Sequence, residues 1–128
     1  MSLSRELLLQ PVSGPSVKTY TFPEDYPEPF GGAEFHVRIW TSKERSSFEA
    51  SLTNKSGSPD KSKYQSFSER LLVATLCDEN GILLMAEADI SSLSNQDGRI
   101  IGYSAEAAAT ANSISAVDVQ SLSRSLHC

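Results

Sequence analysis

The stretch from Leu76 to Glu87 has spacing close to that of a calcium-binding loop. If Gly81 takes the sixth loop position, Asp78 and Asn80 fall at the third and fifth positions, and a glutamate stands at the twelfth. The first position would then be Leu76, which has no ligand oxygen. Loss of the first carboxylate normally removes such a site. We therefore predict a helix-terminating turn here and no bound metal.

The histidines and cysteines are too scattered to predict a metal site or an activated nucleophile. His36 and His127 are not four residues apart, and neither stands at zinc-ligand spacing from a cysteine. Cys77 lies in an apolar run, with no nearby histidine and no lysine in its own predicted helix to lower the pKa of its thiol. Together, Cys77 and Cys128 are too few for a disulfide framework, which favours a reducing cytoplasm.

The serines, acids and lysines also fit no catalytic pattern. No Gly-x-Ser-x-Gly motif is present, and the Ser-x-x-Lys match at 58–61 falls in a polar segment. Glu24, Asp25 and Glu28 could act as a general acid and base, but in a proline-rich loop we expect them to be solvated. The lysines at 55–63 lack the arginines and interleaved aromatics of a nucleic-acid site. We predict a non-enzymatic protein without a cofactor.

Length and charge describe a small acidic protein. The chain has 128 residues, with 11 basic against 16 acidic side chains and a net charge of -5. This length supports one core, so we predict a single domain over residues 1–128. The acidic balance argues against nucleic-acid binding, which depends on lysine and arginine. No segment reaches the roughly 20 apolar residues of a membrane span.

The spacing of apolar residues, which predicts the secondary structure, changes at Thr41. Before it, residues 17–22 and 35–40 alternate between apolar and polar side chains, which predicts two strands around a proline-rich loop. A helical turn is also expected near residues 4–10. Residues 1–40 are therefore predicted to be an N-terminal extended segment with a small β-ribbon. The apolar face of the second strand would carry Phe35, Val37 and Ile39.

After Thr41 the apolar residues recur with the period of a helix. Thr41 and Glu44 form a capping box for a helix over residues 42–52. We expect a mobile linker near residues 54–64 within the helical part, residues 41–128. Further helices are predicted over residues 66–77, 87–93, 99–112 and 115–126. The fold class is α+β: a small N-terminal β-ribbon or hairpin followed by a compact bundle of four to five short helices.

From residue 35 onward, an extended segment runs into a capped helix with a Glu-Arg pair and a polar linker follows. Then come an apolar helix, an acidic turn with glycine and an alanine-containing helix. These stretches are FHVRIWTSKERSSFEASL at 35–52, RLLVATLCDENG at 70–81, ILLMAEADISSLS at 82–94 and NSISAVDVQSL at 112–122. Their order and spacing, more than any single stretch, resemble those of the tail assembly chaperones of long-tailed bacteriophages and prophages.

The resemblance implies a protein of the host bacterial cytoplasm that is absent from the finished tail. Such chaperones bind the long, apolar, helical tape-measure protein before the tail tube polymerises around it. Expected partners are the tape-measure protein, the tail tube protein and further copies of the chain, but not nucleic acid or membranes. The alternative is another small phage structural protein, such as a head–tail connector or a tail-completion component.

Two apolar stripes are suited to helix-in-groove binding of such a client. One lies on the predicted 66–77 helix and is wider than one core contact requires. The other lies on the predicted C-terminal helix, which could detach or repack at low cost and is the preferred contact element. The alternative interpretation of each stripe is that it belongs to the core. The residues expected to contact the client are Val119, Leu122, Leu126, Phe67, Leu72 and Leu76.

Overall fold

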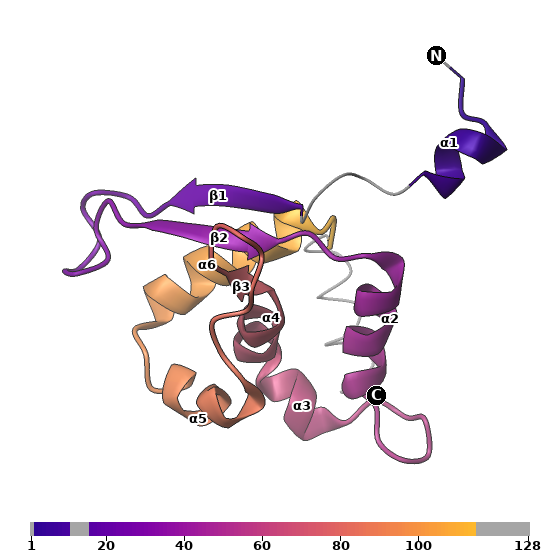
Figure 1. Cartoon of the computed structure of the whole chain (residues 1–128). Helices are drawn as coiled ribbons and strands as arrows, with labels where there is room; N and C mark the ends of the chain where they lie inside the picture. Colours follow the sequence, from indigo (N-terminus) through magenta and orange to yellow (C-terminus); the bar gives the residue numbers. More distant parts are fainter. Residues whose placement is uncertain (1, 11–15, 115–128) are drawn as a thin grey trace.

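The computed structural model describes residues 2–10 and 16–114 (Figure 1). In this part of the chain a three-stranded antiparallel sheet is joined by short helices, which confirms the predicted α+β class. None of the helices described is long and apolar enough to cross a membrane. The elements in chain order are α1 (Arg5–Leu9), β1 (Val17–Thr21), β2 (Glu34–Arg38), α2 (Ser42–Ser51), α3 (Lys61–Gln65), α4 (Phe67–Thr75), β3 (Leu76–Cys77), η1 (Glu87–Asp89), α5 (Ile90–Leu93) and α6 (Gly98–Ala111).

The strands β1 and β2 form the N-terminal hairpin that the alternation predicted. They pair antiparallel, with Tyr20 opposite Phe35 and Thr19 opposite His36. On one face, Val37 is fully buried against the helices. On the other face, the Thr19 hydroxyl lies 2.8 Å from Nδ1 of His36. The period of two in this sequence therefore decides which side of the sheet meets the helices.

The third strand, β3, differs from the sequence prediction. We predicted one helix over residues 66–77, but α4 ends at Thr75 and the next two residues pair with β2. Leu76 has extended backbone angles, φ -67° and ψ 125°. Cys77 stands opposite His36 and is only 1% exposed. Pairing with β2 and burial of this thiol outweigh the helical period, which continues through both residues in the sequence.

The start of α2 follows the predicted capping signal. The Thr41 hydroxyl accepts a hydrogen bond from the Glu44 N–H at 3.2 Å. The Glu44 carboxylate also accepts from Nε and Nη2 of Arg38, at 2.8 and 3.0 Å. These hydrogen bonds from Arg38 are the main reason that the pKa of Glu44 lies below its ordinary value. The ion pair thereby fixes α2 to the end of β2.

The segment near residues 54–64, predicted to be a mobile linker, contains defined structure. Asn54 Oδ1 accepts hydrogen bonds from the N–H groups of Ser56 and Ser58, at 3.0 and 3.1 Å, and closes a turn. The Asp60 carboxylate then caps α3 by accepting from two backbone N–H groups of its first turn. The short polar side chains that suggested a solvated linker here form turns and a helix cap instead.

Two clusters of buried side chains hold the helices on the sheet. In Figure 1, α4 lies below the strands, between α2 and α6. It supplies Leu71 to the larger cluster and Leu72 to the smaller one, so it is the central element of the core. The larger cluster consists of Val37, Phe48, Leu52, Leu71 and Ala108. The smaller cluster consists of Leu72, Ile101 and Ala105.

The end of α6 is fixed both by its own backbone and by β2. Ser113 has a positive φ of 58°, and the Ile114 N–H donates to the Ala109 carbonyl at 2.7 Å, as in a Schellman motif. Just before this turn, Asn112 Oδ1 accepts from the Trp40 N–H at 2.7 Å. Its Nδ2 donates to the Arg38 carbonyl at 3.1 Å. One amide side chain therefore joins the end of α6 to the segment that follows β2.

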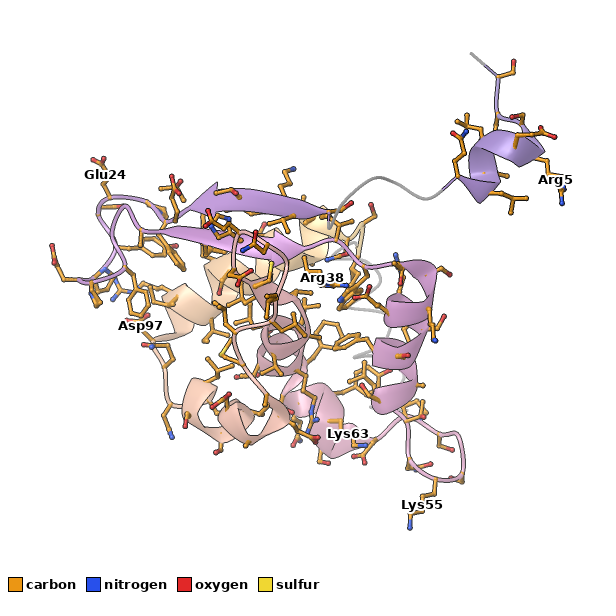
Figure 2. All side chains as sticks on the ribbon, in the orientation of Figure 1. Arg5, Glu24, Arg38, Lys55, Lys63 and Asp97 are labelled. Atoms are coloured by element: carbon orange, nitrogen blue, oxygen red, sulfur yellow. The ribbon has the colours of Figure 1, made fainter. Side chains whose placement is uncertain are left out.

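The loop between β1 and β2 is packed by aromatic side chains. The Phe22 ring lies 4.7 Å from Phe35 and 5.5 Å from Tyr103 of α6, between ring centroids. A side chain at Gly31 could not be accommodated, because its Cβ would lie 2.7 Å from a backbone oxygen. The acids of this loop, considered above as a general acid and base, are all exposed: Glu24 (Figure 2), Asp25 and Glu28.

The later helices agree with the sequence pattern. The predicted 87–93 helix is divided into η1 and α5, and the predicted 99–112 helix is α6. Small residues on α6, including Ala105 and Ala108, are buried against α4, as expected for closely packed helices. The helix predicted over residues 115–126 lies outside the described residues.

Candidate protein-binding surface

The residues expected to contact a client differ in how deeply they are buried, and some lie outside the described residues. Leu72 is only 1% exposed and belongs to the smaller core cluster. Phe67 and Leu76 are partly buried against the larger cluster. Leu72 is therefore a core residue, which was the alternative interpretation of its stripe. The side of α4 that can meet a partner carries other residues. Outside the described residues lie Val119, Leu122 and Leu126.

That other side of α4 borders a hollow of about 280 Å³ between α2, α4 and α5. A cavity of about 150 Å³ is large enough to hold benzene, so this hollow has room for more than one branched side chain. It opens beside the core, because Phe48, which is itself largely buried, contributes to its wall. The apolar side chains that line it are Phe48, Val73, Ala74 and Ile90.

Charged groups stand at the edge of the hollow. Arg70 Nη1 lies 3.7 Å from a carboxylate oxygen of Glu87, and the Arg70 Nε donates to the Ser66 hydroxyl at 2.9 Å. Lys63, labelled in Figure 2 beside α3, is the second cation that lines the hollow. Two cations and one carboxylate give this edge a positive balance, although the chain as a whole is acidic.

A run of exposed apolar side chains follows β3. Ile82, Leu83 and Leu84 are 65%, 43% and 63% exposed. In Figure 1 the segment passes from the sheet down to α5, and its continuation supplies Glu87 and Ile90 to the hollow. Contiguous exposed apolar surface commonly marks a protein interface. We refer to residues 82–84 as the apolar loop.

Hydrogen bonds to the preceding turn and to β3 hold the backbone of the apolar loop, and the Leu84 N–H donates to the Leu76 carbonyl at 3.0 Å. The Asp78 carboxylate accepts from the N–H groups of Asn80 and Ile82, at 2.8 and 3.0 Å. Gly81 has a positive φ of 85°, and its carbonyl accepts from Arg38 Nη1 at 2.8 Å. A loop fixed in this way loses less conformational entropy when it binds a partner.

The other side chains that could act as a nucleophile or a metal ligand have structural roles. Burial raises the pKa of the Cys77 thiol, and the nearby Asp78 charge raises it further, so that the reactive thiolate is disfavoured. The Asp78 carboxylate, considered above as a calcium ligand, accepts backbone hydrogen bonds. Among residues 2–10 and 16–114, no group of three histidine, cysteine, aspartate or glutamate side chains is placed to hold a metal ion.

The sequence patterns did not reveal the hollow or the anchoring of the apolar loop. The expected contacts were placed on the stripe with Leu72 and Leu76, which is the more apolar side of the helix. The signal that could have found the hollow is the spacing of Arg70, Val73 and Ala74, which places a cation and two apolar residues on one face of a helix.

Comparison with known proteins gives no match. No family model, no curated protein and no solved structure is similar to the chain. The resemblance to tail assembly chaperones therefore depends on the sequence stretches within residues 35–122.

Proposed function

We propose that this chain is a phage or prophage tail assembly chaperone that binds the tape-measure protein in the host bacterial cytoplasm, without catalysing a reaction. The hollow between α2, α4 and α5 is the observation that carries the proposal. Its apolar wall and charged edge suit one face of an amphipathic helix, in which apolar residues recur every three or four positions. The ordered sequence stretches described above support the same class of protein.

The apolar loop is a second exposed apolar surface, and it precedes Glu87 and Ile90 of the hollow in the chain. A client helix seated between α2 and α5 would meet Val73 and Ile90, and the adjoining chain segment carries Ile82 to Leu84. A long apolar client needs several such contacts, because one helix turn buries too little surface for stable binding. The proposed client therefore has extended apolar stripes, as the tape-measure protein of this class does.

Co-expression with fragments of a tape-measure protein tests the proposal. Val73→Glu or Ile90→Glu places a carboxylate in the apolar wall, and we expect either change to reduce recovery of the client in a pull-down at least tenfold. Tenfold corresponds to about 1.4 kcal/mol. Thr110→Glu, at an exposed position of α6, is the matched control and should bind as the unaltered chain does.

A thermal melt of each variant separates loss of binding from loss of folding. If both hollow variants melt normally and still recover the client, the proposed contact is wrong. If the unaltered chain recovers no tape-measure fragment but is found in purified tails, the head–tail connector or tail-completion alternative is favoured instead.

A further inference from the structure

The helix α1 carries apolar side chains that nothing in the described chain covers. None of its residues is buried. A helix of five residues gains too little from its own hydrogen bonds to be stable in water, so its helical form calls for a surface that covers its leucines. The exposed leucines are Leu3 (69%), Leu7 (40%), Leu8 (66%) and Leu9 (64%).

The hollow between α2, α4 and α5 has the size and apolar wall that α1 requires. Its volume of about 280 Å³ accommodates two leucine side chains, since about 150 Å³ suffices for benzene. Val73, Ala74 and Ile90 provide the apolar contact. Adjacent leucines such as Leu7 and Leu8 could therefore enter together.

The charges of α1 and of the hollow are complementary. Arg5 and Glu6 directly precede Leu7 in the chain (Arg5 is labelled in Figure 2). The edge of the hollow presents Lys63, Arg70 and a carboxylate. With the leucines inserted, Glu6 can face Lys63, the cation at this edge that is not already paired with Glu87.

We propose that α1 of one copy docks in the hollow of a second copy of this chain. The exposed leucines show that α1 is not seated on its own hollow in the structure. Each copy has one α1 and one hollow, so reciprocal docking gives a closed two-fold dimer in which both leucine clusters are covered. The inference goes beyond the proposed function, because the occupant of the hollow is then the protein itself when no client is present.

Site-directed disulfide formation in the full-length chain tests this arrangement. One copy carries Leu8→Cys and the other Ser51→Cys, an exposed residue that lines the hollow, and both carry Cys128→Ser. We expect mixing under mild oxidation to give a disulfide-linked pair. Ser47→Cys, exposed on α2 but outside the hollow, is the matched control and should form the pair at least tenfold more slowly.

Charge reversal provides a second, independent measurement by sedimentation. Glu6→Lys or Lys63→Glu alone should raise the dimer dissociation constant at least tenfold, and the chain carrying both should recover most of the lost affinity. Chains with normal melting that stay monomeric at all concentrations would overturn the proposal. An exclusively intrachain disulfide in a chain with both Leu8→Cys and Ser51→Cys would overturn it as well. No client is present in these measurements, so their outcome is separate from that of the client pull-down.

Discussion

At the scale of single residues, Asn112 connects distant parts of the chain. Its side chain accepts from the Trp40 N–H and donates to the Arg38 carbonyl, and its own carbonyl accepts from Arg45 Nη1 at 3.0 Å. The residue is only 7% exposed. The amide thus satisfies backbone groups that the end of β2 leaves without strand partners, because an asparagine can accept and donate at the same time.

Replacing Asn112 with alanine should destabilise the protein by about 2 kcal/mol, because it leaves the partly buried Trp40 N–H and Arg38 carbonyl without this partner. Urea denaturation followed by the fluorescence of Trp40 measures the change directly. Asn95→Ala is the control, since the side chain of Asn95 is exposed and donates only to the Ser91 carbonyl at 3.3 Å. That change should cost less than about 0.5 kcal/mol. Equal effects of the two substitutions would contradict the role given to Asn112.

At the scale of elements, the way each helix ends matters as much as the way it begins. The helix α6 ends in a Schellman motif whose left-handed position is occupied by Ser113 instead of glycine. A side chain at positive φ is strained, while the Ile114 that follows still packs against the larger core cluster. The packing of Ile114 therefore maintains a backbone conformation that the serine itself disfavours.

Ser113→Gly should stabilise the protein by roughly 0.5–1 kcal/mol, because relief of the strain at positive φ exceeds the greater flexibility that glycine gives the unfolded chain. The midpoint of urea denaturation should rise. The same substitution in the middle of α2, Ser47→Gly, should lower it by roughly 0.5 kcal/mol, since φ is not positive there. A lower midpoint for Ser113→Gly would show that the serine hydroxyl contributes more than the backbone strain costs.

The elements also show why sequence patterns succeed in some places and fail in others. The β1–β2 hairpin, α2 and α6 were predictable because alternation, a capping threonine and a helical stripe are local signals. The strand β3 was missed because Leu76 and Cys77 continue a helical pattern and become extended only by pairing with β2, some 40 positions earlier in the chain. The helix α3 was missed because a serine- and lysine-rich segment suggested a solvated linker.

The candidate surface was less predictable than the fold. The pattern selected the most apolar stripe of α4, and Leu72 on that stripe is core. The hollow is formed by α2, α4 and α5 together. Their relative placement cannot be predicted from the residue pattern of any one of these helices. The role of Asn112 could not be predicted either, because its partners near Trp40 are more than 70 positions away.

At the scale of the whole molecule, the proposed client binding would be divided between the described surface and the C-terminal segment. Leu122 lies outside the described residues and remains the preferred contact of the sequence analysis. Leu122→Asp should weaken binding of a tape-measure fragment at least tenfold, about 1.4 kcal/mol, while the melting temperature stays unchanged. Pull-down and a thermal melt of the same preparation measure both quantities. An unfolded variant would place Leu122 in the core, and a stable variant with full binding would leave the hollow and the apolar loop as the contact surface.

The hydrogen bonds of Asn112 to the end of β2 also have a consequence for synthesis of the chain on the ribosome. The core cluster around Val37 of β2 includes Ala108 of α6, and the segment that follows β2 is hydrogen-bonded by Asn112. At about 5–20 residues per second, the interval between translation of Trp40 and of Asn112 is roughly 4–14 s. During that interval the core around the hairpin is incomplete, so a nascent chain truncated before residue 112 should remain sensitive to protease. Folding of this core is therefore expected to finish only after Asn112 has been translated.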